Sequence, residues 1–241
     1  MNDLGKTDSD KKLIKVYIAV EVVILIVIQT AIVMKSAHPG AYMYPAIVVN
    51  SAVAAYFYVR YGRTIRDRRD NLILFALFMT LVADWFLTFT GANYGGMTYA
   101  YGLIAFCTVE IIYAVYLRIG PASIIVRTLI YIVGLFGLHR AGMLEVDSAL
   151  GLLNMVLIAM NAVDAWAPKR KGLSMLFRLG ITLFLCCDVT VMLRILTSGS
   201  LSAAVRFMTW IFYVPAQVLL TLSYVEACTG NDVTYSHHLA I

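Results

Sequence analysis

The chain has 241 residues, of which 61% are hydrophobic and only 14% are charged, and its mean hydropathy is +0.81. A soluble domain of this length has too little interior to hide so much apolar surface, so the composition excludes a soluble protein and indicates an integral membrane protein. The net charge of +5 does not indicate nucleic-acid binding, because most of the basic residues lie in loops between apolar segments.

Eight apolar segments follow one another along the chain, and each has about the length that a helix needs to cross a bilayer. These solid apolar runs are unlike the alternating strands of a β-barrel, so the predicted fold class is an all-α bundle of eight transmembrane helices. We expect residues 1–12 to be a disordered cytoplasmic N-terminus, residues 13–227 to be the transmembrane domain, and residues 228–241 to be a short cytoplasmic tail. The expected spans are residues 13–34, 42–60, 72–90, 97–117, 123–138, 148–166, 173–196 and 203–227.

The basic residues predict which loops face the cytoplasm. Lysines and arginines concentrate in the N-terminal segment, in the loop RYGRTIRDRRD after the second span, and in the loop APKRKG after the sixth span. Cytoplasmic loops carry such an excess of positive charge, so we predict that both termini lie in the cytoplasm.

Two spans carry an aspartate within otherwise apolar sequence: Asp84 in LILFALFMTLVADWFLTFT and Asp188 in LSMLFRLGITLFLCCDVTVMLRIL. An ionisable group in hydrocarbon is costly, so it normally faces the protein interior and marks a functional site. In the predicted topology spans three and seven run outward and spans four and eight run inward, which brings Glu110, Tyr213 and Gln217 to similar depths. We expect these five side chains to converge on one buried site.

Acid–base chemistry is what such a site supports. Two carboxylates close together in a low dielectric do not both ionise easily, so one keeps its proton and acts as a general acid while the other acts as a base or stabilises positive charge. The same residue types also serve as interhelical hydrogen-bond glue or as ion relays. Asn154 and Asn161 share one face of the sixth span and suit either glue or site lining. Glu21 and Asp164 are expected to reach the membrane surface.

The sequence lacks the parts of other catalytic classes. No serine stands in a nucleophile elbow, no histidine lies within a span, and neither an H-E-x-x-H motif nor a phosphate-binding loop occurs. The last span has no lysine that would hold retinal. The four cysteines form no C-x-x-C pattern, which predicts packing residues rather than a disulfide or zinc site. We therefore expect no metal and no cofactor.

The order and spacing of these residues resemble the YhhN-like lysoplasmalogenase family of eight-span membrane proteins. TLVADWFLTF is similar to a Gly-Asp segment in the family's third span, with Ala83 in place of the glycine. YGLIAFCTVEIIYAVYL resembles the fourth span, where Tyr113 matches and Glu110 falls on or near the family's histidine. AMNAVDAW resembles the sixth span.

The resemblance continues in the last two spans. Cys187 and Asp188 stand where the family has Ser-Asp, so the serine is lost. YVPAQVLLTLS matches the family's Tyr-x-x-Ala-Gln run at Tyr213, Ala216 and Gln217.

What the resemblance implies is a membrane hydrolase that cleaves the vinyl ether bond of a lysoplasmalogen, a single-chain lipid, into a fatty aldehyde and a glycerophospho-base. It implies Asp84 and Asp188 as the catalytic pair, with a lipid and the bilayer as partners and no nucleic acid. The residues expected to bind the substrate are Glu110, Tyr113, Tyr213, Gln217 and Asn161.

Two functions of other classes use the same residues. A small proton-coupled transporter would carry protons on the intramembrane carboxylates. A non-catalytic lipid-binding membrane protein would hold a lipid and leave it unchanged. In each case we expect a multi-pass protein, in the plasma membrane if the source is a bacterium and in the endoplasmic reticulum if it is a eukaryote.

Overall fold

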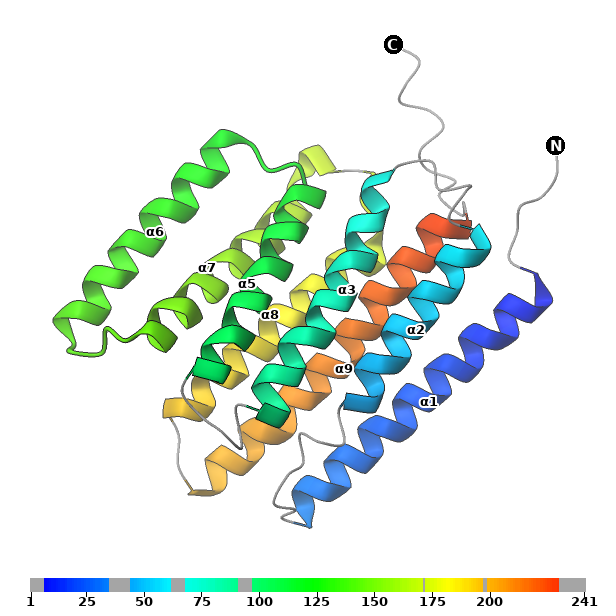
Figure 1. Cartoon of the computed structure of the whole chain (residues 1–241), viewed down its shortest axis with the longest axis horizontal. Helices are drawn as coiled ribbons and strands as arrows, with labels where there is room; N and C mark the ends of the chain where they lie inside the picture. Colours follow the sequence, from blue (N-terminus) through cyan, green and yellow to red (C-terminus); the bar gives the residue numbers. More distant parts are fainter. Residues whose placement is uncertain are drawn as a thin grey trace.

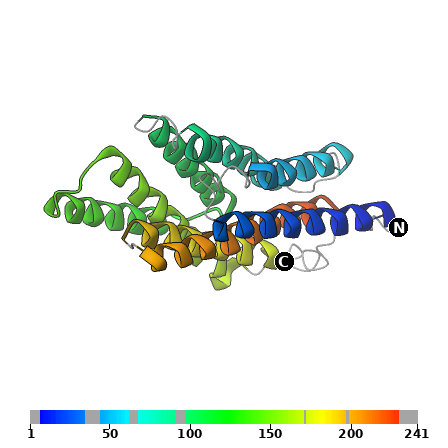
Figure 2. The ribbon, with the colours of Figure 1, turned by 90° about the horizontal axis from the view of Figure 1, so that it is seen from below.

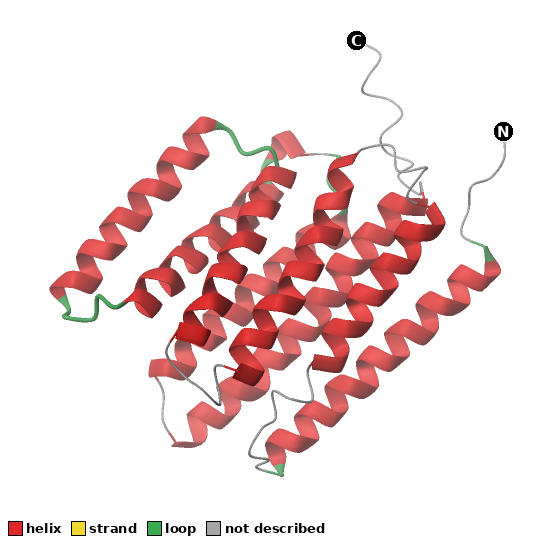
Figure 3. Ribbon diagram, in the orientation of Figure 1, coloured by secondary structure: helices red, strands yellow, loops and turns green. Residues whose placement is uncertain are grey.

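Long helices that alternate in direction make up the computed structural model, which describes residues 7–34, 44–61, 68–90, 97–170, 172–196 and 199–229 (Figure 1). Every regular element within these ranges is a helix, and none is a strand (Figure 3). The predicted all-α fold class is therefore confirmed. α1 begins and α9 ends at the same end of the bundle (Figure 1).

The helices correspond one by one to the apolar segments of the sequence. Two short 3-10 turns, η2 (Arg68–Asp70) and η4 (Pro168–Arg170), precede α3 and α8. The bounds of the long helices are α1 Asp8–Val33, α2 Tyr44–Tyr61, α3 Asn71–Asp84, α5 Met97–Tyr116, α6 Pro121–Arg140, α7 Val146–Trp166, α8 Met175–Leu196 and α9 Gly199–Thr229.

Six of the described helices are long and apolar enough to cross a membrane: α1, α5, α6, α7, α8 and α9. α2 and α3 fall short of that measure, although a π-helical turn, η3 (Trp85–Thr90), continues α3 directly. The structure thus has six to eight helices apolar enough to span a membrane, which indicates a multi-pass membrane protein. The prediction that both termini are cytoplasmic stays a prediction.

The first helix begins earlier than its apolar segment. α1 starts at Asp8 because Thr7 forms a capping box with Asp10, in which each side chain bonds the backbone N–H of the other residue. This box satisfies two of the N–H groups that a helix start leaves unpaired. Residues 8–12 are therefore helical, and residues 1–6 of the expected disordered segment lie outside the described residues. Residues 228 and 229 of the expected tail belong to α9, and the tail from residue 230 lies outside the described residues.

α9 is the helix around which the others gather, and it packs against α8, α2, α1 and α3. Viewed from below, α2 and α3 lie on one side of α9 while α1 lies beside it (Figure 2). Gly180 allows α8 to approach α9 closely, because a Cβ at this position would lie 2.9 Å from Leu220 Cγ. α6 contacts α7 and exposes apolar side chains such as Ile125, Val133 and Phe136, as a helix facing lipid does.

Candidate functional site

Asp84 ends α3 and is 5% exposed. The hydroxyl of Tyr213 on α9 donates a hydrogen bond to Asp84 Oδ2. The rings of Phe184 and Trp210 meet the Tyr213 ring edge-on, with centroids 5.8 and 5.9 Å away, and they fix its position. The π-helical turn begins at the residue after Asp84. Such turns are frequent at functional sites, and the apolar sequence gave no sign of this one.

Asp188 lies on α8 and is partly buried. Asn154 on α7 donates a hydrogen bond of 2.8 Å to Asp188 Oδ2. Asp84 and Glu110 both lie within the range at which the charge of Asp188 acts on them. The three carboxyl groups come from α3, α5 and α8, which are separate parts of the chain.

Glu110 on α5 is fully buried, at 0% exposed. The side-chain amide of Asn161 on α7 donates to Glu110 Oε2 at 2.7 Å and to the backbone oxygen of Glu110 at 2.8 Å. Glu110 Oε1 has no hydrogen-bond partner in the described part of the chain. One oxygen of this buried carboxyl group is thus held by Asn161, and the other is left without a partner, which is costly in a protein interior.

Arg127 was not among the expected site residues, but the structure connects it to this site. Arg127 on α6 is 5% exposed and donates to Asn161 Oδ1 at 2.9 Å. It also forms an ion pair of 2.8 Å with Asp164, which accepts a further hydrogen bond of 2.7 Å from Ser123. The signal in the sequence was an arginine within an apolar span. A continuous network of hydrogen bonds thus connects Asp164 to Glu110 through Arg127 and Asn161.

Two expectations about surface carboxylates are wrong. Asp164 does not reach the membrane surface, because Arg127 offers it a partner inside the bundle. Glu21 is 1% exposed and lies in the interior face of α1. The position of a residue along a helix does not show which way its side chain points around the helix. Here both side chains point into the interior of the bundle.

Tyr113 and Gln217 are buried and lack hydrogen-bond partners in the residues that the structure describes. Tyr113 lies on α5, within electrostatic range of Glu110, and its ring packs against Phe177 with centroids 5.6 Å apart. Gln217 lies four residues after Tyr213 on α9, so the two share one face of that helix. Each is therefore a buried polar group whose missing partner calls for an explanation.

The structure thus joins six of the polar residues in three hydrogen-bonded pairs, and Tyr113 and Gln217 are in none of them. These are Asp84 with Tyr213, Asp188 with Asn154, and Glu110 with Asn161. Tyr44 at the start of α2 adds to the first pair, since it lies within electrostatic range of Asp84. The prediction that these residues are catalytic or bind substrate stays a prediction. Among the described residues no three His, Cys, Asp or Glu side chains gather as a metal site would require.

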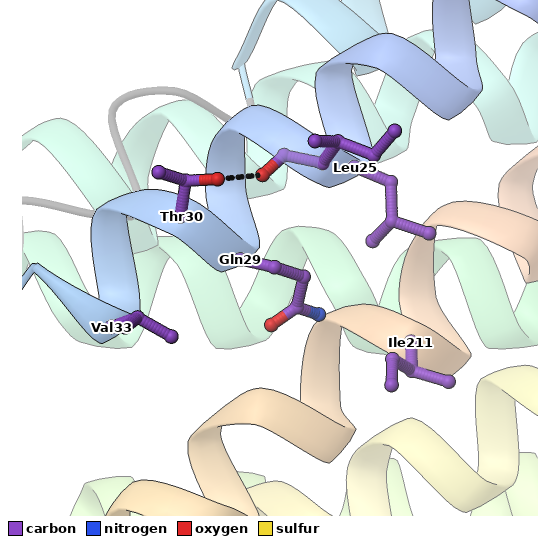
Figure 4. A pocket seen from close by; sticks show the side chains of 6 residues that line it. Leu25, Gln29, Thr30, Val33 and Ile211 are labelled. Carbon is purple, nitrogen blue, oxygen red and sulfur yellow. Dashed lines mark hydrogen bonds between the residues drawn. The ribbon is translucent and has the colours of Figure 1, made fainter.

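Neither Asp84 nor Asp188 lines the two surface cavities described next. A groove of about 410 Å³ runs between α1 and α9, and Figure 4 shows Gln29 and Thr30 beside its apolar side chains. Gln29 crosses it to donate a hydrogen bond of 3.0 Å to the backbone oxygen of Phe207. A second cavity of about 310 Å³ lies where α5 and α7 begin, beside Met97 and Asp147. The first groove is lined by Leu25, Ile26, Gln29, Thr30, Val33 and Ile211.

Comparison with known proteins places the chain in a family. Residues 41–224 match the YhhN family, a stretch that runs from the start of α2 into the last turns of α9 and contains every predicted site residue. No curated protein and no solved structure gives a significant match. At the level of the family, the match fits a lysoplasmalogenase-like function. The resemblance seen in the sequence is confirmed, and the chain belongs to the YhhN family.

Proposed function

We propose that the protein is a membrane hydrolase that cleaves the vinyl ether bond of a lysoplasmalogen-like lipid. The products are a fatty aldehyde and a glycerophospho-base. The observation that carries the proposal is the buried pairing of Asp84 with Tyr213, within electrostatic range of Asp188. Membership of the YhhN family supports the same chemistry.

The reaction needs an acid, a water molecule and a group that stabilises positive charge. A protonated aspartate adds its proton to the double-bond carbon farther from the ether oxygen, which leaves an oxocarbenium ion. The carboxylate of the other aspartate stabilises this cation and takes a proton from the attacking water. The resulting hemiacetal then collapses, and its carbon–oxygen bond to the glycerol breaks. The glycerol oxygen gains the proton that the base took from water, the hemiacetal hydroxyl returns its proton to the first aspartate, and the aldehyde leaves.

The surrounding groups fit supporting roles. Tyr213 fixes the orientation of Asp84, and Asn154 does the same for Asp188. Glu110 and Tyr113 each present an unpaired buried oxygen, as groups that bind a substrate do. Asn161 holds Glu110 in place and is itself held by Arg127. The proposed location is a bacterial plasma membrane.

Mass spectrometry of purified protein incubated with lysoplasmalogen tests this function. We expect aldehyde from the wild type, and none from Asp84→Asn or Asp188→Asn, which keep the shape of the side chain but lose its acid–base function. Asp147→Asn is the matched control, because Asp147 lies at the second cavity, and it is expected to keep full activity.

A folded wild type that releases no aldehyde would show that the proposed reaction is wrong. Lipid-coupled proton flux into liposomes, without product, would then indicate the transporter. A lipid that co-purifies and stays unchanged would indicate a binding protein.

A further inference from the structure

Glu21 is a buried carboxyl group that the proposed mechanism does not use. It lies midway along α1, is 1% exposed, and neither of its oxygens has a hydrogen-bond partner among the described residues. Leaving a buried polar group unpaired is costly, so each such group in a folded protein calls for an explanation. α1 precedes the stretch that matches the YhhN family, so the family match does not assign a role to Glu21.

The register between α1 and α9 places Gln217 opposite Glu21. Tyr17 of α1 donates a hydrogen bond to Asn50 Oδ1 on α2, and Thr221 of α9 donates to the same oxygen at 3.2 Å. Tyr17 and Thr221 therefore lie at one level. Glu21 follows Tyr17 by one turn, and Gln217 precedes Thr221 by one turn on the antiparallel helix. Farther along, Gln29 bonds the backbone of Phe207, two residues from the position that this register places opposite it, so the two helices stay side by side in nearly the same register.

Gln217 is the natural counterpart of Glu21 at this level. It is 1% exposed, and both its amide nitrogen and its amide oxygen lack partners in the described chain. The two side chains do not bond each other, although each has what the other needs. The α2 residue at the same level is Ala46, one turn from Asn50, and it presents only a methyl group. One small group that both donates and accepts a hydrogen bond would satisfy both residues if it lay between Glu21 and Gln217.

Glu21 and Gln217 lie one helical turn along the bundle from the aspartate site. Tyr213, Gln217 and Thr221 are spaced four residues apart, so they form one stripe along α9. Tyr213 bonds Asp84, and Gln217 lies one turn farther along the stripe, about 5.4 Å in rise. In a single-chain vinyl ether lipid, the free glycerol hydroxyl lies at a similar distance from the double bond.

We propose that Glu21 and Gln217 bind a hydroxyl group beside the aspartate site. A hydroxyl donates one hydrogen bond to the carboxyl or amide oxygen and accepts one from the amide N–H, so it fits both side chains. Its source is either the free glycerol hydroxyl of the lipid or a water molecule. The choice of lipid rests on the proposed function.

Binding of an uncleavable lipid tests the site independently of catalysis. The probes are a saturated single-chain ether lysolipid, which has no vinyl bond, and the same lipid methylated at its glycerol hydroxyl. If the lipid supplies the hydroxyl, native mass spectrometry will show the wild type binding the free-hydroxyl lipid roughly tenfold more tightly, as one lost buried hydrogen bond predicts. Glu21→Leu and Gln217→Leu will reduce that preference to less than about twofold.

Two further variants separate hydroxyl binding from helix packing. Glu21→Gln keeps an acceptor and is expected to retain part of the preference. Gln29→Leu removes another polar contact between α1 and α9, the bond to Phe207, and is expected to retain all of it. The proposal is wrong if Gln29→Leu abolishes the preference as Glu21→Leu does.

Water as the source gives a different result. The wild type will then bind both lipids equally, while Glu21→Leu and Gln217→Leu lower aldehyde release from lysoplasmalogen without changing lipid affinity. The proposal is overturned if the wild type binds both lipids equally and the two leucine variants release aldehyde as fast as the wild type. It is also overturned if the wild type binds both lipids equally and releases no aldehyde. A tenfold lipid preference in a wild type that releases no aldehyde would overturn the proposed function and leave the hydroxyl site standing.

Discussion

The phenol of Tyr213 on α9 donates a hydrogen bond to the carboxyl group of Asp84 on α3, across 129 positions of sequence. Both residues are buried, and aromatic rings from α8 and α9 enclose the tyrosine. This contact defines the centre of the candidate site, because Asp188 on α8 lies within electrostatic range of Asp84.

Tyr213→Phe removes the donor to Asp84 and keeps the ring contacts with Phe184 and Trp210. Aldehyde release is expected to fall roughly 10-fold to 100-fold, because one oriented hydrogen bond to a reacting group is lost. Turnover in detergent micelles measures this. Tyr131→Phe is the control: it removes a long hydrogen bond of 3.4 Å from α6 to the Ala149 backbone oxygen on α7, and the activity of this variant should not change.

Asn154→Leu removes the amide that holds Asp188. We expect turnover to fall by about tenfold while lipid binding changes little, because an aspartate that rotates freely is seldom in position to react. Initial rates over a range of lysoplasmalogen concentrations separate the two effects. A raised KM with an unchanged kcat would instead make Asn154 a substrate-binding residue.

Arg127→Met leaves the Asp164 carboxylate buried without its ion pair. Removing one partner of a buried pair costs about 3–5 kcal/mol, so the melting temperature should drop substantially. The double variant with Asp164→Leu should recover much of that loss, because no charge then remains unpaired. Thermal unfolding in detergent tests this, with Arg140→Met as the control because Arg140 is exposed at the end of α6. Equal stability of the single and double variants would contradict the explanation.

Gly180→Ala adds a methyl group where α8 meets α9. The new Cβ would lie 2.9 Å from Leu220 Cγ and 3.2 Å from the Leu220 backbone nitrogen, so the helices must shift. Overpacking of this kind costs about 1–3 kcal/mol. Gly137→Ala is the matched control: it is also inside a helix, has no atom within 4 Å of the new Cβ, and should be neutral or stabilising by up to about 1 kcal/mol. Chemical denaturation of both variants compares them directly.

The sequence alone determined where the helices lie along the chain. Bilayer thickness fixes the length of an apolar span, so the eight segments could be read with bounds close to those observed. The cost of a charge in hydrocarbon singled out Asp84 and Asp188 before any contact was known. The motifs around them were enough to indicate the YhhN family.

Only the tertiary structure decided which polar residues meet. A soluble helix shows its inner face through its apolar stripe, but a helix in lipid is apolar on every side, so the sequence carries little record of how each helix is rotated. That rotation turns Glu21 into the interior and pairs Asp164 with Arg127. The contact between Tyr213 and Asp84 depends in addition on the register of two helices far apart in the chain, which only packing sets.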